Sequence, residues 1–289
     1  MGVHKWYGLK YKEYPIEYSM IFEKETSTQP FEEEVGVTGF GLAQVKPEGD
    51  GVAYDEAAQG FITRYTHITY ALGFIITKET YSDGIAVTVS LRRAGALAFS
   101  MRQTKEVVGA NVLNRAFTPG YTYGDGSRLC VTTHPNVSGG TWSNAMNPAA
   151  DMSEAALEQA CLDIADFKND RGMTIAIRPR KLILPPELEF DTARILKSIQ
   201  QSGTANNDIN ALRILGKFPE GAAINHYLTN ADDWFIKTDC PEGMKYFERW
   251  ADSFGLDNDF DTSNAKFKSE FRCSFGCTDP RSIYGSAGA

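Results

Sequence analysis

The chain has 289 residues, of which 42% are hydrophobic and 23% charged, and its formal net charge is −8. These values are typical of a folded protein and allow one large domain or two ordinary ones. No apolar run approaches the 18 residues that a membrane helix needs, and the negative charge argues against nucleic-acid binding by the whole surface.

The cysteines and the start of the chain indicate a reducing compartment. The five cysteines are odd in number and scattered along the sequence, which is typical of reduced thiols. The stretch Met1–Tyr14 contains no apolar core of the signal-peptide type. We therefore expect the chain to fold in the cytosol.

The first 50 residues are expected to form an extended and irregular arm, because glycines and the breaker sequence Lys46–Gly51 interrupt them. From Glu13 to Gly60 the chain carries eleven acids and two lysines, a net charge of −9, so the remainder sums to +1. Two interpretations stay open: this stretch is a solvated, partly disordered tail, or it contacts another copy of the chain. Its aromatic residues favour contacts.

A β segment and a long helix follow the arm. Phe61–Thr77 contains twelve β-branched or aromatic residues out of seventeen and no proline, so Val52–Tyr81 is expected to form a β-ribbon. After a break at Ser82–Gly84, apolar residues recur with helical period as far as Phe117. A helix of about 30 residues spans about 45 Å, which is longer than a compact domain needs. Its apolar line consists of Ala94, Leu97, Met101, Val108 and Val112.

The long helix, Gly84–Phe117, is basic, with five arginines and lysines against one acid, a net charge of +4. An acidic arm and a basic helix are suited to pairing between copies of the chain. We therefore expect inter-subunit contacts at acidic or exposed positions of the arm and ribbon and at basic positions of the helix. These positions are Glu32, Glu33, Glu34, Tyr54, Asp55, Arg92, Arg93, Arg102 and Lys105.

The centre of the chain, about Asp151–Asp239, alternates helix and strand and indicates a compact α/β unit behind a loop-rich segment at Tyr121–Pro148. Asp151 and Glu154 have the spacing of a capping box at the start of a helix. Short strands are predicted at Thr174–Arg178, Lys181–Leu184, Ala222–Asn225 and Trp234–Thr238. The predicted core residues of the two helices are Leu157, Cys161, Ile164 and Phe167, then Leu188, Thr192, Ile195 and Ile199.

Three further segments complete the prediction. Gly203–Asp208 is expected to be a loop, Leu256–Asn264 an acidic turn, and Ala265–Cys277 a final β-strand.

Motifs that carry chemistry are weak throughout. Gly36–Gly41 lacks the Gly-Lys-Ser/Thr of a phosphate-binding loop. Asp257–Asp261 opens like a calcium loop, but Thr262 and Lys268 stand where Gly and Glu are needed. Histidines and cysteines show no zinc-ligand spacing, and no G-x-S-x-G sequence occurs. We therefore expect no catalytic, cofactor or metal site, and no enzyme.

Several short motifs occur in a specific order from about Tyr18 onward. They are RQTKE at Arg102–Glu106, NRAF at Asn114–Phe117, DFKNDRG at Asp166–Gly172, PRKLILPP at Pro179–Pro186 and TDPR at Thr278–Arg281. No single motif is diagnostic. Together, their order and spacing resemble the major capsid proteins of tailed bacteriophages, specifically the Mu-like major head subunit group.

This resemblance implies an α+β protein with the Hong-Kong-97-type coat fold. By analogy, residues 1–46 are an N-terminal arm and residues 47–83 an extended loop in the form of a β-hairpin. Residues 84–150 are then a peripheral domain with a long spine helix, residues 151–241 an axial α/β domain, and residues 242–289 the C-terminal part of the peripheral domain.

The resemblance also implies a function. The chain is expected to be a structural subunit that self-assembles into the icosahedral shell enclosing the double-stranded DNA genome of a tailed phage, and so to be found in the virion after assembly in the bacterial cytoplasm. Expected partners are its own copies in hexamers and pentamers, a portal, decoration proteins and non-specifically contacted DNA, but no membrane. No long charged helical segment precedes the arm, so we expect a separate scaffolding protein.

Two alternatives of other classes remain at this point. One is the shell of an encapsulin-type compartment, which has the same fold and encloses protein cargo. The other is a soluble oligomeric α/β enzyme, which would need a cluster of titratable groups that the sequence does not reveal.

Overall fold

The computed structural model describes residues 2–83, 86–200 and 209–289, and the chain forms two compact units. Each unit is assembled from segments that lie far apart in the sequence. Unit 1 comprises Met1–Glu32, Tyr65–Asn111 and Tyr246–Phe275, and unit 2 comprises Glu33–Arg64, Val112–Lys245 and Gly276–Ala289. The predicted helix start at Gly84 and the predicted loop Gly203–Asp208 lie outside the described residues.

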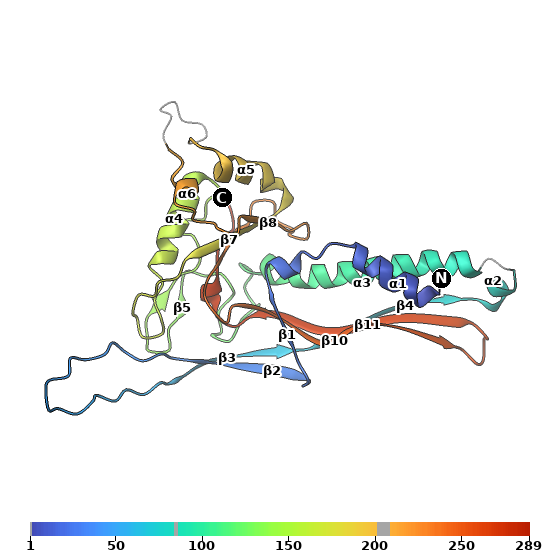
Figure 1. Ribbon diagram of the computed structural model, residues 1–289, viewed down its shortest axis with the longest axis horizontal. Coiled ribbons are helices and arrows are strands. Elements are labelled where there is room, and N and C mark those ends of the chain that lie inside the picture. Colours follow the sequence, from blue (N-terminus) through green and yellow to red (C-terminus); the bar gives the residue numbers. More distant parts are fainter. Residues whose placement is uncertain (1, 84–85, 201–208) are drawn as a thin grey trace. The chain divides into compact units, whose positions relative to one another are not determined.

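Unit 1 is organised by the long helix α3, Ala86–Asn114, whose last turn belongs to unit 2 (Figure 1). The prediction of a long helix is confirmed, although the helix ends before Phe117. Of the predicted apolar line, Ala94, Leu97 and Met101 are buried, whereas Val108 and Val112 are half-buried. The buried face continues instead through Lys105, Glu106, Ala110 and Leu113.

The prediction of a wholly irregular arm is wrong at its start, because Val3–Glu13 forms helix α1. Aromatic contacts within unit 1 hold it: the Tyr7 ring stacks on Phe254 at 4.7 Å, and the Arg102 guanidinium lies 5.0 Å from the Tyr11 ring centre. A helix of 11 residues is marginal in water by itself, so this packing is what stabilises it. The 3₁₀ turn η1, Tyr18–Met20, follows.

A four-stranded sheet in the order β1-β10-β11-β4 completes unit 1. Its strands are β1 (Glu23–Thr26), β4 (Ile68–Ile76), β10 (Met244–Asn258) and β11 (Ala265–Cys277). Strand β11 has the predicted bounds, although it is not the final strand of the chain. The first two residues of β10 and the last two of β11 belong to unit 2. Helix α3 covers one face of the sheet, where the Lys105 ammonium lies 4.6 Å from the centre of the Phe271 ring.

The predicted ribbon Val52–Tyr81 is divided into strand β3 (Gln59–Thr66), strand β4 and the short helix α2 (Lys78–Ser82). Strand β3 pairs with β2 (Phe31–Val37), and β4 pairs with β11. The hairpin expected within residues 47–83 is therefore formed by β2 and β3 instead. Their backbones approach closely, because a Cβ on Gly60 would lie 2.9 Å from the carbonyl oxygen of Gly36.

Unit 2 contains a second four-stranded sheet in the order β12-β9-β7-β8, in which β7 and β8 are parallel. Its helices α4, α5 and α6 pack on this sheet around a core that includes Leu157, Leu182 and Trp234. The strands are β7 (Pro179–Leu184), β8 (Ala222–Ile224), β9 (Trp234–Thr238) and β12 (Ile283–Ser286), and the helices are α4 (Glu154–Ala165), α5 (Glu189–Lys197) and α6 (Ala211–Ile214), with 3₁₀ turns η2 (Pro186–Leu188) and η3 (Pro280–Ser282).

Three local predictions in unit 2 need correction. The cap of α4 is Ser153 rather than Asp151, since the Ser153 hydroxyl accepts a hydrogen bond from the Ala156 amide at 3.2 Å. Thr174–Arg178 is not a regular strand, because only the bridge between Thr174 and Lys168 involves it. Ile199 is exposed, because α5 ends at Lys197 before the apolar face can include it.

The loop-rich segment before α4 contains two short strands, β5 (His134–Pro135) and β6 (Thr141–Trp142). The buried side chain of Asn144 organises it. Its amide nitrogen donates to three carbonyl oxygens, those of Leu129, Pro280 and Ile283, and its oxygen accepts from the Val131 amide and faces Nε2 of His134 at 2.9 Å. The segment is thus ordered by polar contacts rather than by regular structure.

Candidate assembly surfaces

The hairpin of β2 and β3 continues into a connecting segment, residues 38–58, which carries five exposed large apolar side chains. At the two ends of this segment, the Thr38 amide donates a hydrogen bond of 2.9 Å to the Ala58 carbonyl and closes the hairpin. Between these two residues, the chain is extended and largely without regular structure. The exposed apolar side chains are Phe40, Leu42, Val45, Val52 and Tyr54, and Tyr54 is 95% exposed.

A salt bridge ties the two arms of this segment together near its ends. Asp55 accepts hydrogen bonds of 2.7 Å from the Gly41 amide and from the Arg171 guanidinium, which also contacts the carbonyl oxygen of Glu56. The Gly41 amide and then Arg171 hold the pKa of Asp55 below its usual value. The two arms of the connecting segment are therefore tied to each other and to the body of unit 2.

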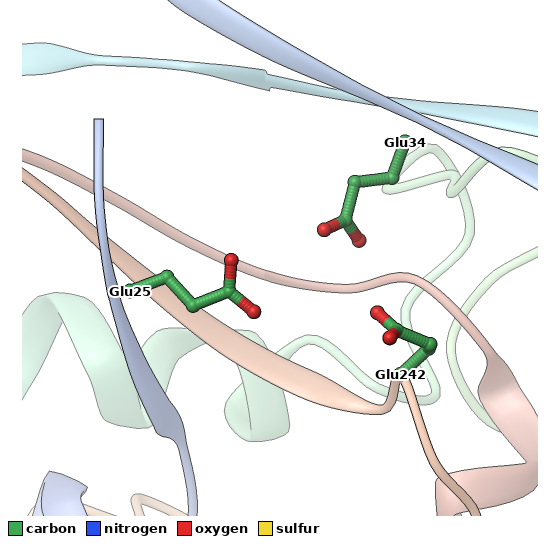
Figure 2. Close-up of side chains that lie close together, drawn as sticks. All are labelled: Glu25, Glu34 and Glu242. Atoms are coloured by element: carbon green, nitrogen blue, oxygen red, sulfur yellow. The ribbon is translucent and has the colours of Figure 1, made fainter. Parts of the chain in front are cut away.

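A buried lysine anchors the base of the same hairpin. Lys245 at the start of β10 is almost inaccessible to solvent, and its ammonium donates to the carboxylates of Glu34 and Glu242. Glu34 also accepts from the Thr278 hydroxyl. Figure 2 shows that the carboxylates of Glu34 and Glu242 point into the same space; Glu25, also drawn, belongs to unit 1. Burial of Lys245 makes this anchor specific, because an unpaired buried charge is costly.

The predicted acidic contact residues have different environments. Glu32 accepts from the Ser27 hydroxyl at 2.5 Å, and Glu34 is part of the Lys245 anchor. Glu33 forms a loose, half-exposed ion pair with Arg64 at 3.6 Å. Of the three, Glu33 therefore has the carboxylate that is most available to a second subunit.

The predicted basic residues also divide into two groups. Arg92 and Arg93 are exposed, and Arg93 donates to the carbonyl oxygen of Ile75 at 2.6 Å. Arg102 and Lys105 are buried, with 6% and 2% of their surfaces exposed. Burial lowers the pKa of Lys105, whose ammonium lies 3.9 Å from Glu248 of its own chain. Arg102 and Lys105 thus belong to the core of unit 1, and the expectation that they contact another subunit is corrected.

A second apolar surface lies on unit 2 around α5 and α6. Its side chains are 64% exposed or more. Other residues of α5 and α6, including Thr192 and Leu212, line an open hollow of about 380 Å³. This surface was not predicted from the sequence, because Ile199 was expected in the core and α6 was too short to show an outward face. The exposed residues are Phe190, Ile199, Ile209, Ile214 and Leu215.

A larger hollow, of about 800 Å³, lies in unit 2 between the end of α4, the segment Thr174–Arg180 and the loop after α6. Its one thiol is Cys161, and burial raises the pKa of that group to about 11. A thiol with such a pKa is protonated at neutral pH and is a poor nucleophile. The hollow therefore does not supply an activated cysteine.

None of the described helices is long and apolar enough to cross a membrane.

Comparison with known proteins gives a family and a fold. A family model described as phage capsid protein matches residues 61–286. The comparison with curated proteins found no significant match. Among solved structures, the capsid of a native GTA particle has a TM-score of 0.55 at 12% identity and covers 94% of this chain and 90% of that one.

Two further structures are similar over nearly the whole chain. The structure from Mycobacterium phage Adephagia has a TM-score of 0.54 at 9% identity, covering 94% of this chain and 90% of that chain. A virus-like particle from Pyrococcus furiosus has a TM-score of 0.51 at 12% identity, covering 98% and 97%. At such identities the similarity establishes a common fold, which is the predicted Hong-Kong-97-type coat fold.

Proposed function

Because this chain belongs to the phage capsid protein family, we propose that it is the major capsid protein that builds the icosahedral head of a tailed phage around double-stranded DNA. Its role is structural: it is a subunit of a capsid shell and not an enzyme. The observation that carries the proposal is the family match over residues 61–286. Membership of the Mu-like group is part of the proposal and rests on the motif order in the sequence.

The proposed regions of the subunit follow the predicted division. Residues 1–46 are the arm, 47–83 the extended loop, 84–150 and 242–289 the peripheral domain, and 151–241 the axial domain. The long helix α3 in unit 1 and the second sheet in unit 2 support a division of the subunit into two separately packed domains. Since β2 pairs with β3, we extend the loop region to include Phe31–Val37.

The proposed contacts between copies use the surfaces described above. The apolar tip of the connecting segment and the apolar surface around α5 and α6 are more exposed than isolated subunits usually tolerate. Closed symmetry repeats each weak contact many times and so makes the shell stable. We expect hexamers and pentamers, a separate scaffolding protein, a portal and decoration proteins as partners. Contact with DNA is expected to be non-specific, since a container does not need to bind its contents tightly.

The alternative of a protein-filled compartment is kept because of one observation. The virus-like particle from Pyrococcus furiosus matches this chain from end to end, with 98% and 97% coverage. Fold similarity alone does not distinguish what a shell contains.

The contents of purified particles decide between the two functions. Particles from cells that express the chain with its neighbouring genes are treated with nuclease and opened, and their nucleic acid and proteins are then measured. Protected double-stranded DNA of uniform length is the expected result. A single co-purified enzyme without protected DNA would favour the compartment.

A further inference from the structure

Strand β4 forms an edge of the unit 1 sheet, and the direction of its backbone groups can be assigned. It pairs with β11 in antiparallel register, with Ala71 opposite Glu270. The carbonyl of Glu270 accepts a hydrogen bond from Ser253 of β10, so it points away from β4. In an antiparallel ladder, opposed residues whose backbone groups point away from each other form a non-hydrogen-bonded pair, and Ala71 and Glu270 are such a pair. The amide and the carbonyl of Ala71 therefore point outward, away from β11. Because this direction alternates along a strand, those of Thr69 and Gly73, two residues away on either side, also point outward.

A second observation supports this assignment. Ile75 lies four residues after Ala71, so its carbonyl also points outward. That carbonyl accepts a hydrogen bond of 2.6 Å from the Arg93 guanidinium and none from β11. Within the described part of the chain, the outward groups of Thr69, Ala71 and Gly73 have no hydrogen-bond partner. All three residues are exposed and have small side chains, so another backbone can approach them.

The composition of β4 is unusual for an exposed edge. Its nine residues, Ile68–Ile76, include no charge and no proline, and Ile68, Leu72 and Ile75 are exposed. Exposed edge strands normally carry charges, prolines or bulges that prevent pairing with other chains. The absence of such features here indicates an edge that is covered by another strand in the assembled protein.

One segment of the chain has the matching properties. Gly41–Lys46 in the connecting segment is extended, and Leu42 and Val45 are 84% and 94% exposed. Among the described residues, no hydrogen bond uses a backbone group of residues 42–46. The segment contains no proline, so every amide that faces a neighbouring strand, which is every second one, can donate to it.

The charges give the pairing a direction. Exposed Glu48 and Asp50 follow the segment, while exposed Arg92 and Arg93 lie near the Ile75 end of β4. A strand parallel to β4 brings these acids beside these arginines, whereas an antiparallel strand moves them away. Opposite charges at the rim of an interface favour the first arrangement.

We propose that Gly41–Lys46 of one copy adds a fifth, parallel strand to the free edge of β4 in a second copy. This inference rests on the proposed capsid function, because it describes one of the contacts that close the shell. Main-chain hydrogen bonds supply the attraction, and the acid–arginine pairs set the register.

Hydrogen–deuterium exchange on unassembled subunits and on shells of the wild-type chain tests the proposal. The amides of Thr69, Ala71 and Gly73, and alternate amides of residues 42–46, are expected to exchange at least about tenfold more slowly in shells, because new hydrogen bonds protect them. Unchanged exchange at residues 69–73 in intact shells would overturn the proposal. Protection there without protection of residues 42–46 would reject the proposed occupant. Absence of shells altogether would instead count against the proposed function.

A matched pair of variants tests the same edge by assembly. Ala71→Pro removes an outward amide without touching the ladder to β11, whereas Ala71→Ser keeps that amide. We expect shell yield to fall at least about tenfold for A71P and to stay at the wild-type level for A71S, because the lost bond recurs in every subunit. Circular dichroism shows whether A71P is folded; if it is folded and assembles normally, the pairing is wrong. The exchange experiment decides the matter if A71P does not fold.

Discussion

At the scale of single residues, neighbouring glutamates in β2 have very different roles. The carboxylate of Glu34 contacts the buried Lys245 ammonium, whereas that of Glu33 faces solvent beside Arg64. Charge counting assigned Glu32, Glu33 and Glu34 one common role, because a net charge does not reveal which side chain turns inward. Reversing all three charges would therefore disturb the subunit itself as well as its assembly.

We predict that Glu34→Ala lowers the free energy of unfolding by about 1–3 kcal/mol, because it removes one acceptor of a buried ammonium. Glu33→Ala is the matched control and should cost less than about 1 kcal/mol, since its ion pair with Arg64 is half exposed. Urea unfolding of the unassembled subunit measures both. Equal effects of the two substitutions would show that the Lys245 anchor is not important for stability.

Asp233, in the turn before β9, gives a prediction for pH. Burial raises the pKa of its carboxyl to about 6, against a hydrogen bond from Asn230 that lowers it. The folded chain thus binds a proton more tightly at this site than the unfolded chain does. The contribution of Asp233 to stability is therefore most favourable below about pH 4 and is lost as the pH rises to about 6.

Asp233→Asn removes this dependence while keeping the size of the side chain. The melting temperature of the wild-type subunit relative to that of D233N should fall between about pH 4 and pH 6 and stay constant above that range. The difference between the two proteins is the informative quantity, because other carboxyls titrate in the same range. A constant difference from pH 4 to pH 7 would contradict the assignment.

At the scale of elements, strong local patterns were predictable and tertiary pairing was not. The long helix and the strand Ala265–Cys277 were recognised because their apolar residues repeat over many turns or alternate over many positions. Helix α1 was missed because it is short and is stabilised by Phe254 and Arg102, which are far away in the sequence. The pairing of β3 with β2 rather than β4 depends likewise on a distant segment.

The candidate contact surfaces were partly predictable for the same reason. The charges of the arm and the helix are visible in the sequence, and Tyr54, Arg92 and Arg93 are indeed exposed. The burial of Arg102 and Lys105 is not visible, because it follows from the exact face that α3 turns toward α1 and the sheet. The inter-subunit role of the exposed positions stays a prediction.

Two glycines of α3 provide a matched prediction at this scale. A Cβ on Gly109 would lie 3.2 Å from the Phe275 ring and 3.3 Å from Tyr18, whereas a Cβ on Gly95 would meet Lys10 and Trp6 at 3.8 Å. Gly95→Ala should therefore stabilise the subunit by about 0.5–1 kcal/mol through helix propensity. Gly109→Val should destabilise it by about 1–3 kcal/mol through overpacking.

Thermal unfolding of the two variants beside wild type measures these effects. We expect Gly95→Ala to raise the melting temperature and Gly109→Val to lower it. A stabilising effect at Gly109 would mean that the close contact of α3 with Phe275 and Tyr18 is absent in solution.

At the scale of the whole molecule, the chain buries several charged side chains and leaves several large apolar side chains exposed. Lys105, Lys245 and Arg102 are buried within the subunit, while Leu42, Val45 and Phe190 are exposed. Such a distribution is unfavourable for a free subunit and favourable once copies cover the apolar segments. This agrees with the family to which the chain belongs.

Negative-stain electron microscopy of the purified chain, with the light-scattering mass of the same sample, tests the central claim most directly. We predict closed icosahedral shells of at least about sixty copies, the minimum for that symmetry, either from the chain alone or after co-expression with a scaffolding protein. A monodisperse oligomer of fewer than about ten subunits under both conditions would contradict the capsid function.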